Sequence, residues 1–415
     1  MSHRDSRQRF VRILGTRGIP GGHGGFESWA EELALHLTDR GWKVAVYCQT
    51  QGGLGVREEI WRGIRLIHIA VPLGGSLGAC LFDLYSTLHA VREGTGVAMV
   101  FGYNTACLNL LYRLRGIPNL LNMDGLEWKR RKYKSWEKAW LLLNEAVGAR
   151  SADHLVADHP VIRSRYARWL PERKITVIPY GARPVLRAGT RELERLGVKP
   201  REYALVVARP EPENSLLEIV RAYSAAPRPY RLVLAGAFSR TNPYQRQVMD
   251  AAGAGVVFAG AVYEHEAIDS LRFHALCYVH GHTVGGTNPS LIEALGAGCP
   301  VVAHDNLFNR GVAGSAAVYF SGETDCRLEF DRLADPAYGA LLEELRWASR
   351  QRHRMAFDLS ERLDQYHHML LRWATGEVPI PAPLPEYPAL SLPRLPISAL
   401  KEHAEAELET LEVLR

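Results

Sequence analysis

Six glycines fall within the eleven residues from Gly15 to Gly25, between an apolar run at 11–15 and a segment with helical spacing. Glycine has no Cβ, so backbone N–H groups in such a loop can approach a ligand closely, and a helix that starts there adds partial positive charge. The loop therefore predicts a phosphate site that includes Gly24 and Gly25, with His23 as a weaker candidate for a catalytic role. A loop that only turns the chain is the alternative.

The common phosphate-binding fingerprints do not fit this loop. A dinucleotide fingerprint requires G-x-G-x-x-G and an acidic residue at the end of the second strand. Here the glycines are spaced G-x-x-G-x-x-G, and the second apolar run ends with Tyr47, Cys48 and Gln49. A Walker A loop requires glycine followed by lysine, and the sequence contains no such pair. The sequence thus argues against an oxidoreductase and against a nucleotide hydrolase.

A second glycine-containing segment, GHTVGGTNPSLIEALGAGCPVV, follows the apolar run at 276–280. Pro289 stands where helices accept proline, so a helix should begin there and leave N–H groups open to a diphosphate. Glu293 lies near the start of that helix, where its carboxylate can accept hydrogen bonds from both hydroxyls of a ribose. Its alternative role is an acid that only complements the helix dipole. The residues expected to bind the ligand here are Thr287, Asn288, Ser290, Leu291 and Glu293.

Basic residues are concentrated in the first half of the chain. Residues 1–185 contain 26 Lys and Arg against 16 Asp and Glu, whereas the remainder contains 24 against 29, so the net charge changes from +10 to −5. This asymmetry indicates that the first half faces something anionic. The densest cluster consists of Lys129, Arg130, Arg131, Lys132 and Lys134, interleaved with Trp128, Tyr133 and Trp136.

Three partners are compatible with this basic cluster: solvent alone, nucleic acid, or an anionic membrane surface. No zinc spacing, stacking sheet or recognition-helix motif supports nucleic acid, so we expect none. Basic side chains interleaved with aromatic rings favour the headgroup zone of an anionic leaflet, which is the partner we expect. A solvated basic loop remains the alternative.

Short apolar runs alternate with helix-length segments along nearly the whole chain, which is typical of parallel strands covered on both faces by helices. Since ligands of such sheets bind beyond the carboxyl ends of the strands, the chemistry is expected in the loops that follow them. The runs expected to form strands are 11–15, 43–48, 65–70, 97–102, 119–123, 154–158, 176–179, 203–208, 230–236, 255–260, 275–281, 299–304 and 316–320.

The positions of glycine and proline residues along the chain predict two Rossmann-like domains and two terminal segments. Gly and Pro residues between 181 and 201 place a boundary near residue 185. The predicted units are 1–185, 186–356, a closing amphipathic helix at 357–375, and a proline-rich tail with a terminal helix at 376–415. Six scattered cysteines, no long apolar run and a polar start indicate a cytoplasmic protein without a membrane span.

Taken together, these motifs resemble the retaining glycosyltransferases of the GT-B fold in family 4. The resemblance rests on Gly24-Gly25 after the first strand and on the segment EALGAGCPVV that begins at Glu293, and it covers residues 10–373. It implies two domains that face a cleft, the first binding an acceptor and the second a nucleotide sugar. The family's Arg-x-x-x-x-Lys pair falls on Arg209 and Asn214, which are therefore expected at the donor.

More narrowly, the segments GTRGIPGGHGGFE, NMDGLEWKR, ARPEPEN and HGHTVGGTNPSLIEAL resemble the rhamnosyltransferase-type branch, which acts in capsule, exopolysaccharide and O-antigen assembly. The resemblance implies transfer of rhamnose from dTDP-rhamnose to a lipid-linked oligosaccharide. Two positions depart from the wider family: Gly285 replaces the first glutamate of its E-x7-E motif, and Asn214 replaces the lysine. The sugar contact and one diphosphate charge must then come from elsewhere or be absent.

The same resemblance implies a mechanism without a cofactor. The sequence contains no Asp-x-Asp motif, so we expect no metal, and Arg209 with helix ends should stabilise the leaving diphosphate. Asp124, in the segment NMDG, stands where the family carries a residue that lines the reacting sugar, although an Asp-Gly turn is the alternative. The competing functions are a nucleotide-sugar epimerase of the same fold and a non-catalytic subunit that only binds a nucleotide sugar.

Overall fold

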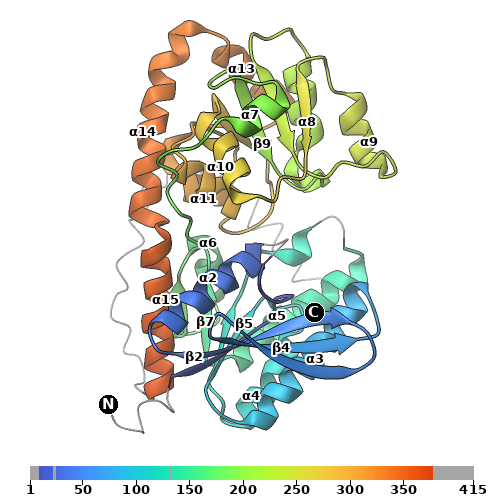
Figure 1. Ribbon diagram of the computed structural model, residues 1–415, viewed down its shortest axis with the longest axis vertical. Helices are drawn as coiled ribbons and strands as arrows, with labels where there is room; N and C mark the ends of the chain where they lie inside the picture. The colour runs from blue at the N-terminus through green and yellow to red at the C-terminus, as the bar shows by residue number, and fades with distance from the viewer. Residues whose placement is uncertain (1–8, 22–24, 131–132, 377–415) are drawn as a thin grey trace.

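The computed structural model describes residues 9–21, 25–130 and 133–376 of the chain (Figure 1). Two sheets of mainly parallel strands, each covered by helices, confirm the predicted α/β class with two Rossmann-like domains. Several predictions fall outside the described residues; they concern His23, Gly24, Arg131, Lys132 and the tail from residue 377 onward.

The first sheet has eight strands in the order β3-β4-β2-β1-β5-β6-β7-β8. Every neighbouring pair is parallel except β3 with β4. The strands are β1 (Phe10–Leu14), β2 (Lys43–Gln51), β3 (Gly55–Trp61), β4 (Ile64–Val71), β5 (Val97–Phe101), β6 (Asn119–Asn122), β7 (His154–Ala157) and β8 (Ile175–Val177). The α-helices of this part are α2 (Gly25–Asp39), α3 (Gly75–Glu93), α4 (Asn109–Leu114), α5 (Ser135–Ser151) and α6 (Pro160–Ala167).

The antiparallel strand β3 is absent from the strands that the sequence predicted. Its residues GVREEIW contain no continuous apolar run, and all of them except Trp61 are exposed. A strand at the edge of a sheet can stay open to solvent, so it lacks the apolar signal by which the buried strands are recognised. The remaining strands coincide with the predicted runs to within a few residues.

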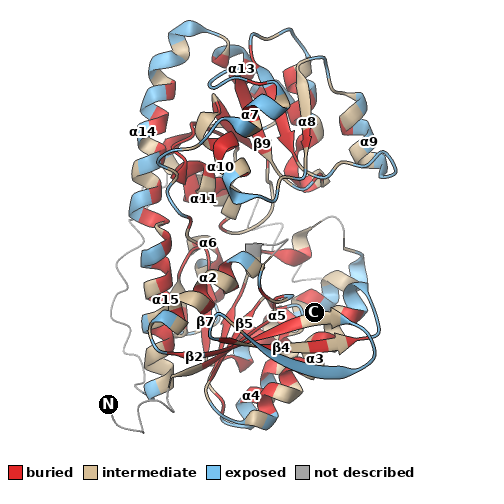
Figure 2. Cartoon of the chain, in the orientation of Figure 1, coloured by how far each residue is buried: buried red, intermediate tan, exposed pale blue. Residues whose placement is uncertain are grey.

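The first sheet is buried on both faces, as the continuous apolar runs predicted. Trp29 and Leu37 of α2 belong to the same buried cluster as Val44 of β2. Tyr47, three residues further along β2, points to the opposite face and joins a second cluster with Phe82 of α3. Figure 2 shows the resulting buried strands inside a shell of half-buried helices. Each fully buried large side chain contributes about 1.5–3 kcal/mol to stability.

The second sheet has six strands in the order β11-β10-β9-β12-β13-β14, and all neighbouring pairs are parallel. The strands are β9 (Tyr203–Val207), β10 (Arg231–Ala235), β11 (Val256–Gly260), β12 (Cys277–His280), β13 (Val301–His304) and β14 (Ala317–Phe320). The α-helices are α7 (Arg191–Leu196), α8 (Leu216–Ser224), α9 (Pro243–Asp250), α10 (His265–His274), α11 (Pro289–Gly296), α12 (Leu307–Ala313) and α13 (Glu323–Leu333).

Two consecutive helices run along one side of both domains, α14 (Gly339–Ala356) beside the second and α15 (Leu359–Thr375) beside the first (Figure 1). The helix expected at 357–375 is thus found as α15, which returns to the first domain. Asp364 of α15 pairs with Arg40 of α2 at 2.5 Å, and the ring of Tyr366 lies 5.5 Å from that of Trp29. This return anchors the second domain to the first, so that the loops at the ends of their strands face each other.

Candidate functional site

The loop at residues 281–288, here called the second glycine loop, connects β12 to α11. Asn288 caps the helix, because its Oδ1 accepts hydrogen bonds from the N–H (3.0 Å) and the hydroxyl (2.8 Å) of Ser290. The Ser290 hydroxyl oxygen accepts a further bond from the Tyr278 hydroxyl at 2.9 Å. Leu291 is fully buried, and its N–H donates to the Asn288 carbonyl at 3.1 Å. These three predicted site residues therefore build the loop with their own hydrogen bonds.

Thr287 connects the second glycine loop to the other domain. Its N–H donates to Oδ2 of Asp158 at 2.9 Å, and its hydroxyl donates to the Asp158 carbonyl oxygen. Asp158 directly follows β7, at the carboxyl end of the first sheet. The N–H groups of Thr287, Ser290 and Leu291 are thus engaged within the protein and are not open to a diphosphate as the sequence predicted. Within the described residues, no acceptor is bonded to the N–H groups of Gly285, Gly286 and Asn288.

Glycines allow the two domains to touch at this loop. A Cβ on Gly125, in the loop after β6, would lie 2.8 Å from the carbonyl carbon of Gly285. A Cβ on Gly286 would collide with the Asp158 carboxylate. Gly285 itself has a φ of 151°, which L side chains rarely adopt, although a Cβ there would have open space. A side chain at position 285 would therefore have room for its Cβ but would strain the backbone.

Glu293 projects from α11 with 40% of its side chain exposed. Its Oε2 forms an ion pair with Nη2 of Arg272, a side chain of α10 that is only 4% exposed. Arg272 also faces Asp269 at 3.5 Å. This contact fixes the carboxylate of Glu293 while its Oε1 forms no hydrogen bond to a described residue. One oxygen is thus available to a ligand hydroxyl, and Arg272 is a positioning residue that the sequence analysis missed.

Arg209 follows β9 and is exposed, and it forms no ion pair with any described residue. Asn214 is 5% exposed, and its Nδ2 donates to the Arg209 carbonyl oxygen at 2.7 Å. The amide of Asn214 therefore shapes the loop that carries Arg209. One of the two N–H groups of this amide is thus used within the protein, and its role is to support the residue expected at the diphosphate.

A second arginine, Arg130 of the first domain, approaches the same region. Burial, followed by the charges of Arg130 and Arg209, lowers the pKa of His282 in the second glycine loop to about 3, so both charges act on this imidazole. Arg130 pairs with Glu127 at 2.6 Å. Glu213 is another neighbour of Arg130: it is 7% exposed, and neither carboxylate oxygen has a hydrogen-bond partner among the described residues. The charges of two cations, one from each domain, thus act on the second glycine loop.

Asp124 lies in the loop after β6, beside this group of cations. Its φ of 53° is left-handed, and its carboxylate Oδ1 accepts the N–H of Gly125 at 2.7 Å. Buried Asn122 supports the loop by accepting the N–H of Asp124 at 3.0 Å and donating to the Tyr366 hydroxyl of α15 at 2.8 Å. Burial, then the charges of Glu127 and Asp158, raises the pKa of Asp124 to about 7. The Asp-Gly turn is therefore present, and it holds a carboxyl group whose pKa is close to neutral pH.

The first glycine loop, Gly15–Gly25, is organised differently in its described part. The N–H of Arg17 donates to Oε1 of Glu27 at 3.0 Å, and the N–H of Gly21 donates to Oε2 of Glu31 at 2.6 Å. Both carboxylates come from α2, the helix that begins at Gly25. Two of the N–H groups expected to face a phosphate are therefore bonded to acidic side chains of the same domain.

Two of the described residues at the basic cluster contact other side chains, in contrast to the prediction. Trp128 is 8% exposed, and its ring lies 5.4 Å from Nζ of Lys129 and 5.3 Å from the guanidinium of Arg165. It is thus part of the core and not available to a headgroup zone. Arg130 is engaged by Glu127, whereas Lys134 is exposed at the start of α5.

Beyond Lys134, helix α5 presents apolar side chains to solvent. Trp136, Trp140 and Leu143 are 68%, 42% and 55% exposed, and their spacing puts them on one helix face. Lys138 stands between them along the chain. In the part of the chain that the structure describes, no helix is both long and apolar enough to cross a membrane.

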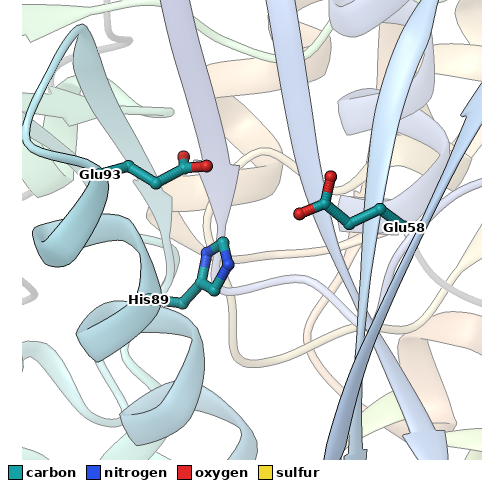
Figure 3. Close-up of side chains that lie close together, drawn as sticks. All are labelled: Glu58, His89 and Glu93. Atoms are coloured by element: carbon teal, nitrogen blue, oxygen red, sulfur yellow. The ribbon is translucent and has the colours of Figure 1, made fainter.

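The described residues include one group with the residue types of a metal site, Glu58 of β3 with His89 and Glu93 of α3 (Figure 3). Arg65 occupies both carboxylates, at 2.6 Å from Glu58 and 2.7 Å from Glu93. A side chain therefore already supplies a positive charge to these acids, and the group consists of ion pairs at the edge of the sheet.

Two Rossmann-like domains whose strand ends face each other, with a short return helix onto the first domain, define the GT-B fold. The family model described as "Glycosyl transferase 4-like domain" matches residues 24–181. A search of curated protein sequences found no match.

Solved structures agree with this fold. The chain is similar to a sucrose-phosphate synthase from Thermosynechococcus elongatus, with a TM-score of 0.73 at 17% identity over 89% of this chain and 100% of that one. It is also similar to HepE from Anabaena in complex with UDP, with a TM-score of 0.67 at 14% identity over 87% and 99%. An α,α-trehalose-phosphate synthase (UDP-forming) from Burkholderia vietnamiensis gives 0.66 at 11% identity over 87% and 99%. These likenesses show the GT-B fold.

The structure adds three residues that the sequence analysis did not single out. Asp158 could have been found, since it ends a predicted strand on the side where ligands of such sheets bind. Arg272 carries no local signal, because its pairing with Glu293 depends on how α10 packs beside α11. Glu213 lies in the charged segment RPEPEN, and no pattern in that segment predicts a buried acid.

Proposed function

We propose that the chain is a glycosyltransferase that moves a sugar from a nucleoside diphosphate to an acceptor. The observation that supports this most is that the charges of Arg209 and Arg130, one from each domain, both act on His282 of the second glycine loop. A nucleoside diphosphate placed there has cations for its phosphates and the carboxylate of Glu293 for its ribose. The family match over residues 24–181 and the GT-B fold support the same class of reaction.

In this proposal each residue has a defined task. Arg209 stabilises the charge that grows on the diphosphate as the glycosidic bond breaks, together with the free N–H groups of Gly286 and Asn288. Arg272 holds Oε2 of Glu293, and the free Oε1 accepts hydrogen bonds from the ribose hydroxyls. The reaction requires no metal, since the arginines and amides supply the positive charge. Asp158 fixes the second glycine loop through its two hydrogen bonds with Thr287.

Asp124 lines the sugar end of this site and orients the acceptor hydroxyl or stabilises the sugar. The proposed mechanism is retaining: the acceptor attacks from the face that the diphosphate leaves, and the leaving phosphate accepts the acceptor's proton. No carboxylate nucleophile is then required, in contrast to retaining glycosidases. The proposed donor is dTDP-rhamnose, on the resemblance of the motifs at Gly15–Glu27 and Gly281–Leu295 to that branch.

The acceptor is proposed to be a lipid-linked oligosaccharide of surface-polysaccharide synthesis, reached at the cytoplasmic face of the plasma membrane. The support comes from α5, where exposed Trp136, Trp140 and Leu143 stand beside Lys134 and Lys138. Indole rings that are partly exposed to water favour the headgroup zone of a membrane, and lysines favour anionic lipid. The attachment is therefore peripheral and weakens as salt rises.

The test is a panel of nucleotide sugars incubated with the protein, with and without extracted lipid-linked acceptors. A glycosyltransferase releases nucleoside diphosphate faster with acceptor present and labels the lipid fraction with sugar. An epimerase would convert the nucleotide sugar without any acceptor, and a binding subunit would release nothing above background. Either of these two outcomes would replace the proposal.

A further inference from the structure

Strand β3 forms an open edge of the first sheet. It is the last strand in the order of that sheet, and no strand among the described residues lies on its outer side. Its ladder to β4 runs from Gly55 to Trp61 without a register shift, so the strand has no bulge. The outer side is therefore a regular row of backbone N–H and C=O groups, which is a template for pairing with another strand.

This edge lacks most of the features that prevent pairing. Edge strands are usually protected by proline, by lysine or by a bulge, and the segment GVREEIW has none of these. Two apolar side chains instead face solvent, Val56 with 55% and Ile60 with 72% exposed. Together with Glu58 they point to one face of the strand, because side chains two positions apart point the same way.

The sequence of β3 is complementary to itself in one antiparallel register. Outward-facing backbone groups come from every second residue, so two copies pair only when facing residues are an even number of positions apart. When Glu58 lies on the two-fold axis, Arg57 of each copy is opposite Glu59 of the other, and Val56 is opposite Ile60. Pairs of opposite charge and pairs of apolar side chains are those that stabilise neighbouring strands.

The two adjacent registers are unfavourable. A shift of one allowed step in one direction places Arg57 opposite itself and Val56 opposite Glu58. A shift in the other direction places Glu59 opposite itself and Ile60 opposite Glu58. Like charges that face each other destabilise a sheet, and an apolar side chain gains nothing from a facing carboxylate. The pattern of charge and hydrophobicity therefore selects the register centred on Glu58.

The only like-charge contact of this register is the one on the axis, and it is compensated within each copy. Both carboxylate oxygens of Glu58 accept hydrogen bonds from Arg65, at 2.6 and 2.7 Å. Arg65 also pairs with Glu93, for which Arg12 supplies a second cation at 3.1 Å. Two arginines thus balance the two acids, of which Glu58 and Glu93 are shown in Figure 3. The ion pairs at this edge reduce the repulsion between two Glu58 side chains.

We propose that the chain forms a symmetric dimer in which β3 pairs antiparallel with β3 of a second copy, in the register centred on Glu58. The two eight-stranded sheets then form one continuous sheet across the two-fold axis. Because this axis is perpendicular to the sheet, the carboxyl ends of the parallel strands point in opposite directions in the two copies. Each copy keeps its own second glycine loop, so the inference is independent of the proposed function.

Self-association is measured by sedimentation equilibrium at about 1–100 μM protein, since one strand pair makes a small interface. The wild-type mass should rise with concentration from the 46.3 kDa of one chain towards twice that value. Arg57→Glu places like charges at both ends of the strand pair and should weaken the dimer about tenfold or more. The matched control is Arg240→Glu in the second domain: Arg240 is 64% and Arg57 69% exposed, and each pairs with an acid of its own chain. This control should associate like the wild type.

A charge exchange tests the register. In the double variant Arg57→Glu/Glu59→Arg each glutamate again faces an arginine, so the dimer should return to about its wild-type strength. In either adjacent register the single and the double variants would keep the like-charge contact, and no loss or rescue would occur. Melting curves show whether each variant is folded. Should the double variant fail to fold, an equimolar mixture of Arg57→Glu and Glu59→Arg decides, because the acids of one then face the bases of the other.

Three results overturn the proposal. The first is a wild type that keeps the mass of one chain at every concentration. The second is a folded Arg57→Glu that associates as tightly as the wild type. The third is the failure of both the folded double variant and the mixture to associate more tightly than Arg57→Glu alone. Loss of the dimer in Arg57→Glu with its return in the double variant or in the mixture supports the pairing of β3 in the proposed register.

Discussion

The two glycine loops look alike in the sequence but differ in what their N–H groups contact. In the first loop, Glu27 and Glu31 of the following helix accept the N–H groups of Arg17 and Gly21. In the second loop, the N–H groups of Gly285, Gly286 and Asn288 have no described partner, and arginines approach from both domains. Glycine spacing thus identifies where a backbone can approach a ligand, and the neighbouring charges decide whether that ligand is an anion.

The largest effect that this comparison predicts is at Arg209. Arg209→Ala should lower kcat by about 100- to 1,000-fold, because charge grows on the diphosphate in the transition state, and should change ground-state donor binding much less. The measurement is steady-state kinetics with the nucleotide sugar that the panel identifies. Wild-type activity should be unaffected by EDTA. Loss of activity in EDTA that magnesium or manganese restores would contradict the metal-free mechanism.

A smaller effect is expected at the ribose contact, and here the two loops can be compared directly. Glu293→Gln keeps the size but removes the charge, and hydrogen bonds to charged groups contribute about 1.5–3 kcal/mol, so donor use should weaken roughly ten- to a hundredfold. Glu27→Gln, the equivalent change beside the first loop, should leave nucleoside diphosphate affinity unchanged. A calorimetric titration that finds the opposite order would reverse the assignment of the loops.

A several-fold effect is expected at the membrane face. Replacing Trp136 by Ala and Lys134 and Lys138 by Ser should reduce co-sedimentation with liposomes that contain anionic lipid, because both the apolar and the basic contribution are lost. Rising salt should release the wild type. Trp347, which is 64% exposed on α14, offers a control: Trp347→Ala should sediment like the wild type. Equal sedimentation of all three proteins would contradict the membrane contact and show that α5 only faces solvent.

The last effect concerns pH and is measured on stability, not on activity. The pKa of Asp124 is raised to about 7 in the folded protein, above the value of about 3.9 expected when unfolded, so the folded state binds more protons between these values. Stability from this group is therefore present at low pH and is lost as pH rises through 7. Asp124→Asn should melt like the wild type near pH 4 and at a higher temperature than the wild type above pH 7.

The control for that measurement is Asp39→Asn, at the exposed end of α2. The melting difference between this variant and the wild type should not grow with pH. Buried histidines such as His159, whose pKa burial lowers to about 3, act with the opposite sign in both proteins and cancel in the comparison. A melting difference for Asp124→Asn that is constant from pH 4 to 8 would contradict the raised pKa.

Much of the fold was predictable from the sequence because buried parallel strands leave continuous apolar runs. Strand β3 was not, since an exposed edge leaves no such run. Within the site, Glu293 and the helix start at Pro289 followed from local sequence. The pairing of Thr287 with Asp158 and of Glu293 with Arg272 joins residues that are 129 and 21 positions apart. Such contacts depend on the packing of whole elements, and no local pattern records them.

The basic cluster is a second case in which the sequence did not show which residues are exposed. Trp128 and Trp136 are equally aromatic in the sequence, yet one is 8% and the other 68% exposed. Trp128 lies in a short 3-10 helix before α5, where the guanidinium of Arg165 covers its ring, whereas Trp136 lies on the outer face of α5. Composition predicted an amphipathic surface in this region, and only the fold shows which of its residues form that surface.

The most direct test of the account is a crystal structure of the protein with a nucleoside diphosphate bound. The account predicts that the diphosphate lies between Arg209 and Arg130, against the N–H groups of Gly286 and Asn288, with the ribose hydroxyls on Glu293. A diphosphate bound instead to residues 17–21 of the first glycine loop would contradict it.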